Sequence, residues 1–159
     1  MSQGDDIQVV VFRVGGQEFA FNVFHVQRIL RHAAPSPLPQ APAFLEGILQ
    51  VQGVVVPVID LRKRFELAEA RLREETRIMV LEVESLTVAV IVDAVLEVLR
   101  ISVDAVTLPP EVVRGLAAEY IQGIITVGAR TVVLLQTGKL LTSHERIALE
   151  AVQAEPVHG

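Results

Sequence analysis

The chain contains two similar halves, and this duplication restricts it to folds built from two like units. Shifted by 69 positions, Val9–His32 overlies Ile78–Ile101 without a gap, and seven of the 24 aligned residues are identical. Two later landmarks recur in the same order at a shift of 76, residues 44–48 with 120–124 and residues 56–59 with 132–135. Valine-rich hairpins align partly by chance, but three ordered landmarks favour a true duplication. We therefore expect two copies of roughly 60 residues each.

Aliphatic residues branched at Cβ dominate the apolar part of the composition. The chain has 27 Val and 11 Ile but only seven aromatic residues. Such side chains pack well on a pleated surface and lose rotamer freedom in a helix, so the fold should be mostly β. Apolar runs between turn residues predict strands at Val9–Val14, Gln17–Val23, Val54–Ile59, Arg77–Val83, Leu86–Val92 and Thr131–Gln136.

Helix signals are weak and confined to two short segments. Asp60 is placed to cap a turn over Leu61–Phe65, and Ser143 is placed to cap a C-terminal helix that ends at Leu149. Residues 150–159 should form a flexible tail. Short helices, one of them C-terminal, therefore accompany the strands.

The two copies predict two small β-barrels, at about residues 9–65 and 77–141. Neither copy has a long linker of its own. We therefore expect a single domain in which the barrels share a core and unfold together.

Composition and charge exclude several classes of protein. The absence of cysteine excludes a disulfide framework, a thiolate zinc site and a cysteine nucleophile. A net charge of −5 and a pI near 5.4 make nucleic acid an unfavourable partner. No apolar run reaches the roughly 18 residues of a membrane span, and the first residues do not have the pattern of a signal peptide. We expect a cytoplasmic protein without membrane insertion.

The residues that commonly carry chemistry do not form a site in the sequence. The four histidines lack metal-ligand spacing, and no phosphate-binding glycine loop or nucleophile elbow is present. Asp60 and Asp93 follow apolar runs and suggest either an acid–base pair or caps of the turns that end strands. Caps are the better interpretation. We expect no catalytic residue, no bound metal and no cofactor.

Several short motifs follow one another along the chain in a fixed order. They are Val26–Ile29, Pro42–Ile48, Gly53–Arg62, Val90–Val95, Tyr120–Gly123 and Lys139–Leu141. No single motif is specific. The ordered set extends from about Val9 to Leu149 and resembles the CheW family of chemotaxis coupling proteins.

This resemblance implies two interlocked SH3-like five-stranded barrels and no enzymatic activity. It implies an adaptor of a chemosensory array that joins the cytoplasmic tip of a methyl-accepting chemoreceptor to the regulatory domain of a CheA-type histidine kinase. That kinase domain pairs with the adaptor barrel to barrel, and the receptor tip lies in the groove between the adaptor's barrels. Two rival hypotheses are a small barrel that binds another ligand or nucleic acid, and an adaptor of a divergent, non-chemotaxis sensory pathway.

The resemblance also implies which residues contact the partners. Carried over by position, they are Val26, Arg28, Ile29, Gly47, Gln52, Val88, Ala89 and Val98. An apolar groove accepts the face of an amphipathic helix, and the small residues Gly47 and Ala89 would let a helix come close. The alternative interpretation is that Val26, Val88 and Val98 are core residues, because strand alternation alone does not identify the inward face.

The sequence departs from the usual family pattern at three positions. The family usually has Asn-Leu-Arg-Gly where this chain has Gln50–Gly53, and Glu where this chain has Arg28. Gln136 replaces a common acidic residue, which is a minor change. The two lost charges are opposite, so we hypothesise that positions 28 and 52 are neighbours across adjacent strands and changed together. These departures question whether the standard partner contacts are kept.

Overall fold

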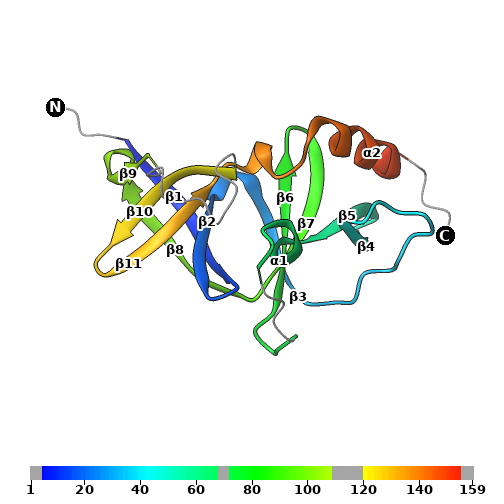
Figure 1. The fold of residues 1–159 in the computed structure, drawn as a ribbon, viewed down its shortest axis with the longest axis horizontal. Coiled ribbons are helices and arrows are strands. Elements are labelled where there is room, and N and C mark those ends of the chain that lie inside the picture. The colour runs from blue at the N-terminus through cyan, green and yellow to red at the C-terminus, as the bar shows by residue number, and fades with distance from the viewer. Residues whose placement is uncertain (1–4, 68–71, 109–119, 155–159) are drawn as a thin grey trace.

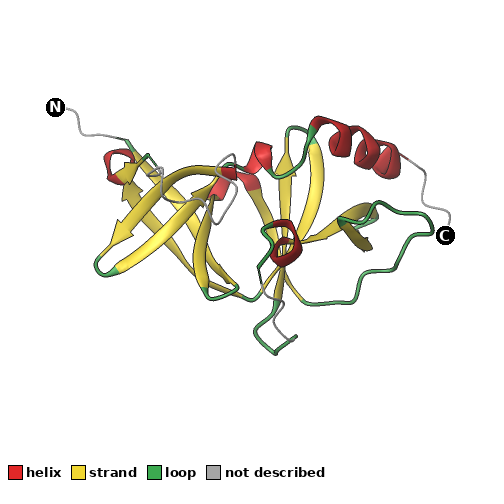
Figure 2. Ribbon diagram, in the orientation of Figure 1, coloured by secondary structure: helices red, strands yellow, loops and turns green. Residues whose placement is uncertain are grey.

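The six strands predicted from the apolar runs are present with small shifts of their ends, and the structure adds five strands that those runs did not predict. The computed structural model describes residues 5–67, 72–108 and 120–154 (Figure 1; Figure 2). Its strands are β1 (Asp6–Val14), β2 (Gln17–Asn22), β3 (Val26–Arg31), β4 (Leu45–Val51), β5 (Val54–Asp60), β6 (Arg77–Val83), β7 (Leu86–Val92), β8 (Ala94–Ser102), β9 (Val106–Thr107), β10 (Ile121–Val127) and β11 (Arg130–Leu135). Its helical segments are η1 (Val23–His25), α1 (Leu61–Arg64), η2 (Val103–Ala105), η4 (Thr137–Lys139) and α2 (Ser143–Ala154). The five added strands are β3, β4, β8, β9 and β10, and the predicted fold class, mostly β, is confirmed.

Each sheet takes its strands from both copies of the duplication. Sheet A has the order β8-β1-β2-β11-β10-β9, and sheet B has the order β3-β6-β7-β5-β4. The parallel pairs β2–β11 and β5–β7 join strands of one copy to strands of the other. Figure 1 shows sheet A on the left and sheet B on the right. The predicted bounds of 9–65 and 77–141 therefore describe the copies along the chain and not the sheets.

Both sheets are closed by the segment that follows an edge strand. In sheet A, β9 follows β8 through the turn η2 and pairs with β10 at Thr107 and Ile124. In sheet B, Ser36 lies beyond the end of β3 and exchanges two backbone hydrogen bonds of 2.9 Å with Ile48. The two closures are equivalent under the duplication, so each sheet becomes a small barrel, here called barrel A and barrel B.

Two equivalent glycines lie beneath the closing segments. Gly47 and Gly123 each stand at a register shift of the strand that receives the closing segment. A β-carbon at Gly47 would overlap the carbonyl oxygen of Ser36, and one at Gly123 would overlap the Val106 side chain. Gly47 also has a φ of +151°, which side chains rarely allow. Barrel closure therefore requires glycine at these positions.

Among the described residues, the buried apolar side chains form three clusters, one inside each barrel and one between them. The cluster inside barrel A includes Val9 and Val11, and the cluster inside barrel B includes Val80 and Ala89. The third, here called the shared core, takes members from both sheets and from both α-helices: Val10, Phe12, Val14, Phe19, Phe21, Leu45, Ile59, Leu61, Phe65, Met79, Leu81, Val83, Leu86, Val88, Val90, Val92, Ile121, Val133, Leu135, Leu140, Leu141 and Leu149. Burial of this cluster stabilises both sheets at once.

A buried ion pair connects the ends of the two sheets. Asp60 caps α1, as predicted, by accepting from the backbone N–H of Arg62, and it also accepts 3.0 and 2.8 Å hydrogen bonds from the Arg62 guanidinium. Arg62 reaches Asp93 at 3.8 Å, and Asp93 accepts from the backbone N–H of Gly15 in the β1–β2 turn. The carboxylates of both aspartates thus accept hydrogen bonds from backbone N–H groups.

The C-terminal helix α2 begins and ends differently from the prediction. Thr142, and not Ser143, is the cap, because its hydroxyl accepts from the Glu145 N–H while the Glu145 carboxylate accepts from the Thr142 N–H. The helix continues past Leu149 to Ala154. Residues 150–154 are therefore helical and not part of a flexible tail, and residues 155–159 lie outside the described residues. Neither this helix nor any other in the described part is long and apolar enough to cross a membrane.

Arg64 links α2 to the barrels through polar contacts. Its guanidinium donates a 3.0 Å hydrogen bond to Glu145 and lies 5.2 Å from the centre of the Phe44 ring. Burial acts to lower the pKa of Arg64, but hydrogen bonds and charge interactions with Glu145 and Tyr120 raise it overall above its ordinary value. The link therefore stays charged and joins α1, α2 and the start of β10.

The shared core predicts that the barrels unfold in one cooperative transition. Separation of the sheets would expose apolar residues of both, so neither barrel keeps its packing when the other unfolds. Scanning calorimetry should give a calorimetric enthalpy equal to the van't Hoff enthalpy. Two resolved transitions would contradict this expectation.

Arg62→Ala should lower the free energy of unfolding by about 3–5 kcal/mol, because it leaves the Asp60 carboxylate buried without its guanidinium. Denaturant titration would measure this loss. Arg146→Ala is the matched control. Its ion pair with Glu84 is 2.7 Å long but partly exposed, at 32% and 58% of the two side chains, so its removal should cost less than about 1 kcal/mol.

Gly47→Ala should lower the free energy of unfolding by roughly 2 kcal/mol or more, through backbone strain and overlap with Ser36. Gly138→Ala is the control, since a β-carbon there would meet its nearest neighbour, Glu84, at an ordinary 3.4 Å. Equal stability of the two variants in a urea titration would show that closure does not require glycine at position 47.

Candidate docking surface

Two edge strands carry the exposed aliphatic residues that the sequence analysis singled out. β3 pairs with β6 in sheet B, and β8 pairs with β1 in sheet A. The strands are equivalent under the duplication, and even their register shifts coincide, between Val26 and Arg28 in β3 and between Val95 and Glu97 in β8. Equivalent positions of β3 and β8 therefore point to equivalent faces of the two sheets.

Ile29 and Val98 lie at the exposed margin of the shared core. Ile29 is opposite Met79, and Val98 is opposite Val10. Directly opposed residues point to the same face of a sheet, and both partners belong to the shared core. Since β3 and β8 are edge strands, Ile29 remains 44% exposed and Val98 56% exposed. Both are therefore available to a partner on the face where the barrels meet.

Val26 and Val95 mark the inner ends of these strands. Both are half-buried and pack against the shared core. From there β3 runs along the edge of one sheet and β8 along the edge of the other, as Figure 1 shows. We call the residues that β3 and β8 present on this face the edge-strand surface: Val26, Ile29, Arg31, Val95, Val98 and Arg100.

Three of the predicted contact residues do not reach the surface. Val88 is 1% exposed in the shared core, and Ala89 is fully buried inside barrel B. Gly47 is buried beneath Ser36. The expectation that Gly47 and Ala89 let a helix come close is wrong, because barrel closure and barrel packing already occupy the space above them. The core alternative is correct for Val88 and wrong for Val98, and Val26 is intermediate.

Arg28 and Gln52 are exposed but lie on strands that are not paired. β3 and β4 are the two edges of sheet B, and Gln52 occupies the left-handed turn between β4 and β5 with a φ of 51°. No ladder of hydrogen bonds therefore joins β3 to β4, and the closeness of the two side chains stays a prediction. Arg28 forms no hydrogen bond with Gln52 in the structure, and within the described residues it has no ion-pair partner.

In barrel A the residue equivalent to Arg28 is Glu97, which pairs at 2.6 Å with Arg130, the first residue of β11. Arg130 also donates to Glu18, and these hydrogen bonds, to Glu18 first and then to Glu97, raise the pKa of the Arg130 guanidinium. The equivalent of Arg130 in barrel B is Val54, and the equivalent of Gln52 in barrel A is Gly128. The closeness of Arg28 and Gln52 therefore stays a prediction.

Sequence reasoning missed two exposed residues beside the predicted set. Phe24, in η1 between β2 and β3, is 88% exposed, and Leu96, at the register shift of β8, is 37% exposed. Phe24 had no signal, since an aromatic residue between two strands is usually buried. Arg31 and Arg100 were also outside the predicted set, but the sequence carried a signal for them, because they are identical residues at equivalent positions of the two copies.

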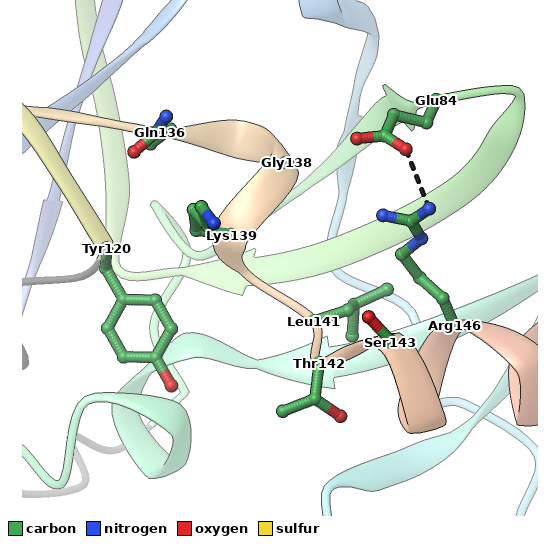
Figure 3. Close-up of a pocket in the computed structure, with 9 residues that line it drawn as sticks. All are labelled: Glu84, Tyr120, Gln136, Gly138, Lys139, Leu141, Thr142, Ser143 and Arg146. Carbon is green, nitrogen blue, oxygen red and sulfur yellow. Dashed lines mark ion pairs between the residues drawn. The ribbon is translucent and has the colours of Figure 1, made fainter.

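The pocket drawn in Figure 3 is lined by residues whose contacts position the start of α2. It has a volume of about 390 Å³ and lies between the β6–β7 turn, η4 and the start of α2. The ion pair of Glu84 and Arg146 crosses it, and the Thr142 hydroxyl accepts from the helix backbone. The Glu84–Arg146 ion pair and the Thr142 hydroxyl therefore hold the start of α2 in place. In the described ranges no cluster of three metal-ligating side chains occurs.

Comparison with known proteins agrees with this architecture. The model of the CheW-like domain matches residues 8–145. "Chemotaxis protein CheW" of Treponema pallidum is 32% identical over 145 residues, which cover 89% of this chain and 85% of the relative. "Protein FrzA" of Myxococcus xanthus is 35% identical over 138 residues, covering 85% and 86%. The crystal structure of scaffolding protein TtCheW from Thermoanaerobacter tengcongensis superposes with a TM-score of 0.81 at 26% identity, covering 90% of this chain and 92% of that one. The chain belongs to the CheW-like domain family.

Proposed function

We propose that this protein is a non-enzymatic adaptor of a chemosensory array, and that it couples the cytoplasmic tips of chemoreceptors to a CheA-type histidine kinase. The observation that carries the proposal is the match to the CheW-like domain over residues 8–145, nearly the whole described chain. Relatives of similar length are named as chemotaxis and scaffolding proteins. Through its partners the adaptor would sit at receptor arrays on the inner membrane.

The fold suits an adaptor because one shared core joins two different faces. The shared core and the Asp60–Arg62–Asp93 contacts fix barrel A against barrel B. A receptor hairpin docked on the edge-strand surface would thus keep a set orientation to a kinase domain docked barrel to barrel elsewhere. Coupling would then work by geometry, since the adaptor sets the orientation of the kinase domain relative to the receptor through its two interfaces.

Helix docking accounts for the exposed aliphatic residues of the edge strands. Ile29 and Val98 are large enough to anchor an amphipathic helix, and Val26 and Val95 continue the apolar path toward the shared core. A few such anchors carry most of the energy of an interface. The proposed receptor contacts from the predicted set are therefore Val26, Ile29 and Val98, whereas Arg28, opposite Val80, points to the other face of β3.

The rival hypothesis of a nucleic-acid-binding barrel gains nothing from the structure. Single-strand binding uses exposed aromatic side chains on a basic face. Phe12, Phe19, Phe21 and Phe65 are buried here, Phe24 is the one exposed aromatic residue in the described part of the chain, and the net charge is −5. A gel-shift assay with single-stranded DNA at low salt should show no complex.

Ile29→Asp and Val98→Asp should each weaken binding to a receptor cytoplasmic fragment by about tenfold or more, because each places a carboxylate in an apolar contact. The probe is the cytoplasmic fragment of a chemoreceptor from the same genome, with affinity measured by titration calorimetry and folding checked by circular dichroism. Ile147→Asp is the control, since Ile147 is 67% exposed on α2, away from both edge strands.

The same titration tests the function itself. The unmodified adaptor should bind both the receptor fragment and the regulatory domain of the cognate kinase with dissociation constants below about 10⁻⁵ M. Failure to bind either protein at tens of micromolar would refute the adaptor role.

A further inference from the structure

The two edge strands repeat one three-residue pattern in structure as well as in sequence. Ile29-Leu30-Arg31 in β3 matches Val98-Leu99-Arg100 in β8. Leu30 packs inside barrel B and Leu99 packs inside barrel A. The residues on either side of each leucine point to the opposite face, which is that of the shared core. An aliphatic residue and an arginine thus stand two positions apart on each half of the edge-strand surface.

Arg31 and Arg100 are both exposed, and within the described residues neither has a carboxylate partner. The half-buried Arg13 and Arg146 pair with Glu75 and Glu84, whereas the exposed Arg28 and Arg73 are, like Arg31 and Arg100, without such a partner in the described part of the chain.

A like charge opposite Arg31 makes the lack of a carboxylate partner energetically unfavourable. Arg31 stands directly opposite Arg77, whose guanidinium is bound to the carbonyl oxygens of Glu74 and Thr76. Like charges at directly opposed positions destabilise a sheet. Arg100, in contrast, is opposite the neutral Gln8. A negative charge brought by a partner would offset the repulsion at Arg31.

The relation between the two halves indicates the shape of the partner. The duplication makes β3 equivalent to β8 and β6 equivalent to β1. The approximate symmetry that relates the two barrels therefore also relates the two three-residue patterns. Two antiparallel helices are related to each other by an approximate two-fold axis. Such a pair can offer the same side chains to both patterns, one helix to each edge strand.

From these observations we propose that Arg31 and Arg100 each bind a carboxylate of a helical hairpin, one from each helix. On each helix the carboxylate lies three or four residues from an aliphatic side chain that contacts Ile29 or Val98, since these spacings share one helix face. The proposal deepens the adaptor function and rests on it, because the hairpin is the receptor tip. It assigns the two arginines as determinants of which receptors are accepted.

The test uses Arg31→Glu and Arg100→Glu in the full chain. Both residues are exposed, so the variants should fold, as circular dichroism can verify. Titration with the same receptor cytoplasmic fragment should show each variant about tenfold weaker or more, because a charge-assisted contact is replaced by repulsion. Binding of the kinase regulatory domain should stay within about twofold of the unmodified protein. The affinity of the unmodified protein for the receptor should fall as salt rises from ~0.05 to ~0.5 M.

Lys139→Glu is the matched control, because Lys139 is an exposed cation on η4, outside both edge strands. Equal weakening by this control would indicate a general charge effect and overturn the proposal. A loss confined to one arginine would overturn the arrangement of one helix to each strand. Unchanged receptor affinity in both arginine variants would overturn the proposal and leave the adaptor function standing. Failure of the unmodified protein to bind the fragment would refute both.

A second-site exchange gives an independent check. Replacing single acidic residues of the receptor tip by Lys should restore the binding of Arg31→Glu or Arg100→Glu for one position on each helix. If no acidic position of the fragment restores either variant, the proposed carboxylate contacts do not exist.

Discussion

The parallel junctions between β2 and β11 and between β5 and β7 are the interactions on which the rest of the structure depends. Each joins strands of one copy to strands of the other, so neither barrel is complete without both. Because the chain must pass between the sheets, η1 and the β7–β8 junction lie at the margin of the shared core. The edge strands β3 and β8 begin there, and this position places the candidate docking surface beside the shared core.

The sequence contained enough information to locate the β1–β2 and β6–β7 hairpins and the cap at Asp60. The bounds of β6 and β7 match the prediction because apolar runs flank Glu84-Ser85, whose positive φ values form a tight turn. Asp60 was identified as a cap because a short carboxylate after a strand satisfies the next free N–H groups. Both signals are local. The exchange of strands was not predictable, since two similar copies allow pairing within a copy or between copies with the same local pattern.

The candidate site was only partly predictable for a related reason. Alternation in a strand shows that two faces differ, but it does not show which face a second sheet will cover. Val88 and Val98 look alike in sequence, yet Val88 lies in a central strand and Val98 in an edge strand. Gly47 was assigned to a close approach, which is correct, but the approaching group is the chain's own Ser36 and not a partner helix.

The interlocked topology also bears on the ancestry of the chain. A single copy would leave the edges of β2 and β5 without their parallel neighbours, and it could cover them only by joining a second copy as a strand-swapped homodimer. The present protein has the architecture of such a dimer with its subunits fused. A single chain is free of the identity that a symmetric dimer imposes on its two halves. Arg28 and Glu97 show this freedom, since they carry opposite charges at equivalent positions of the two copies and make the two sides of the protein unlike.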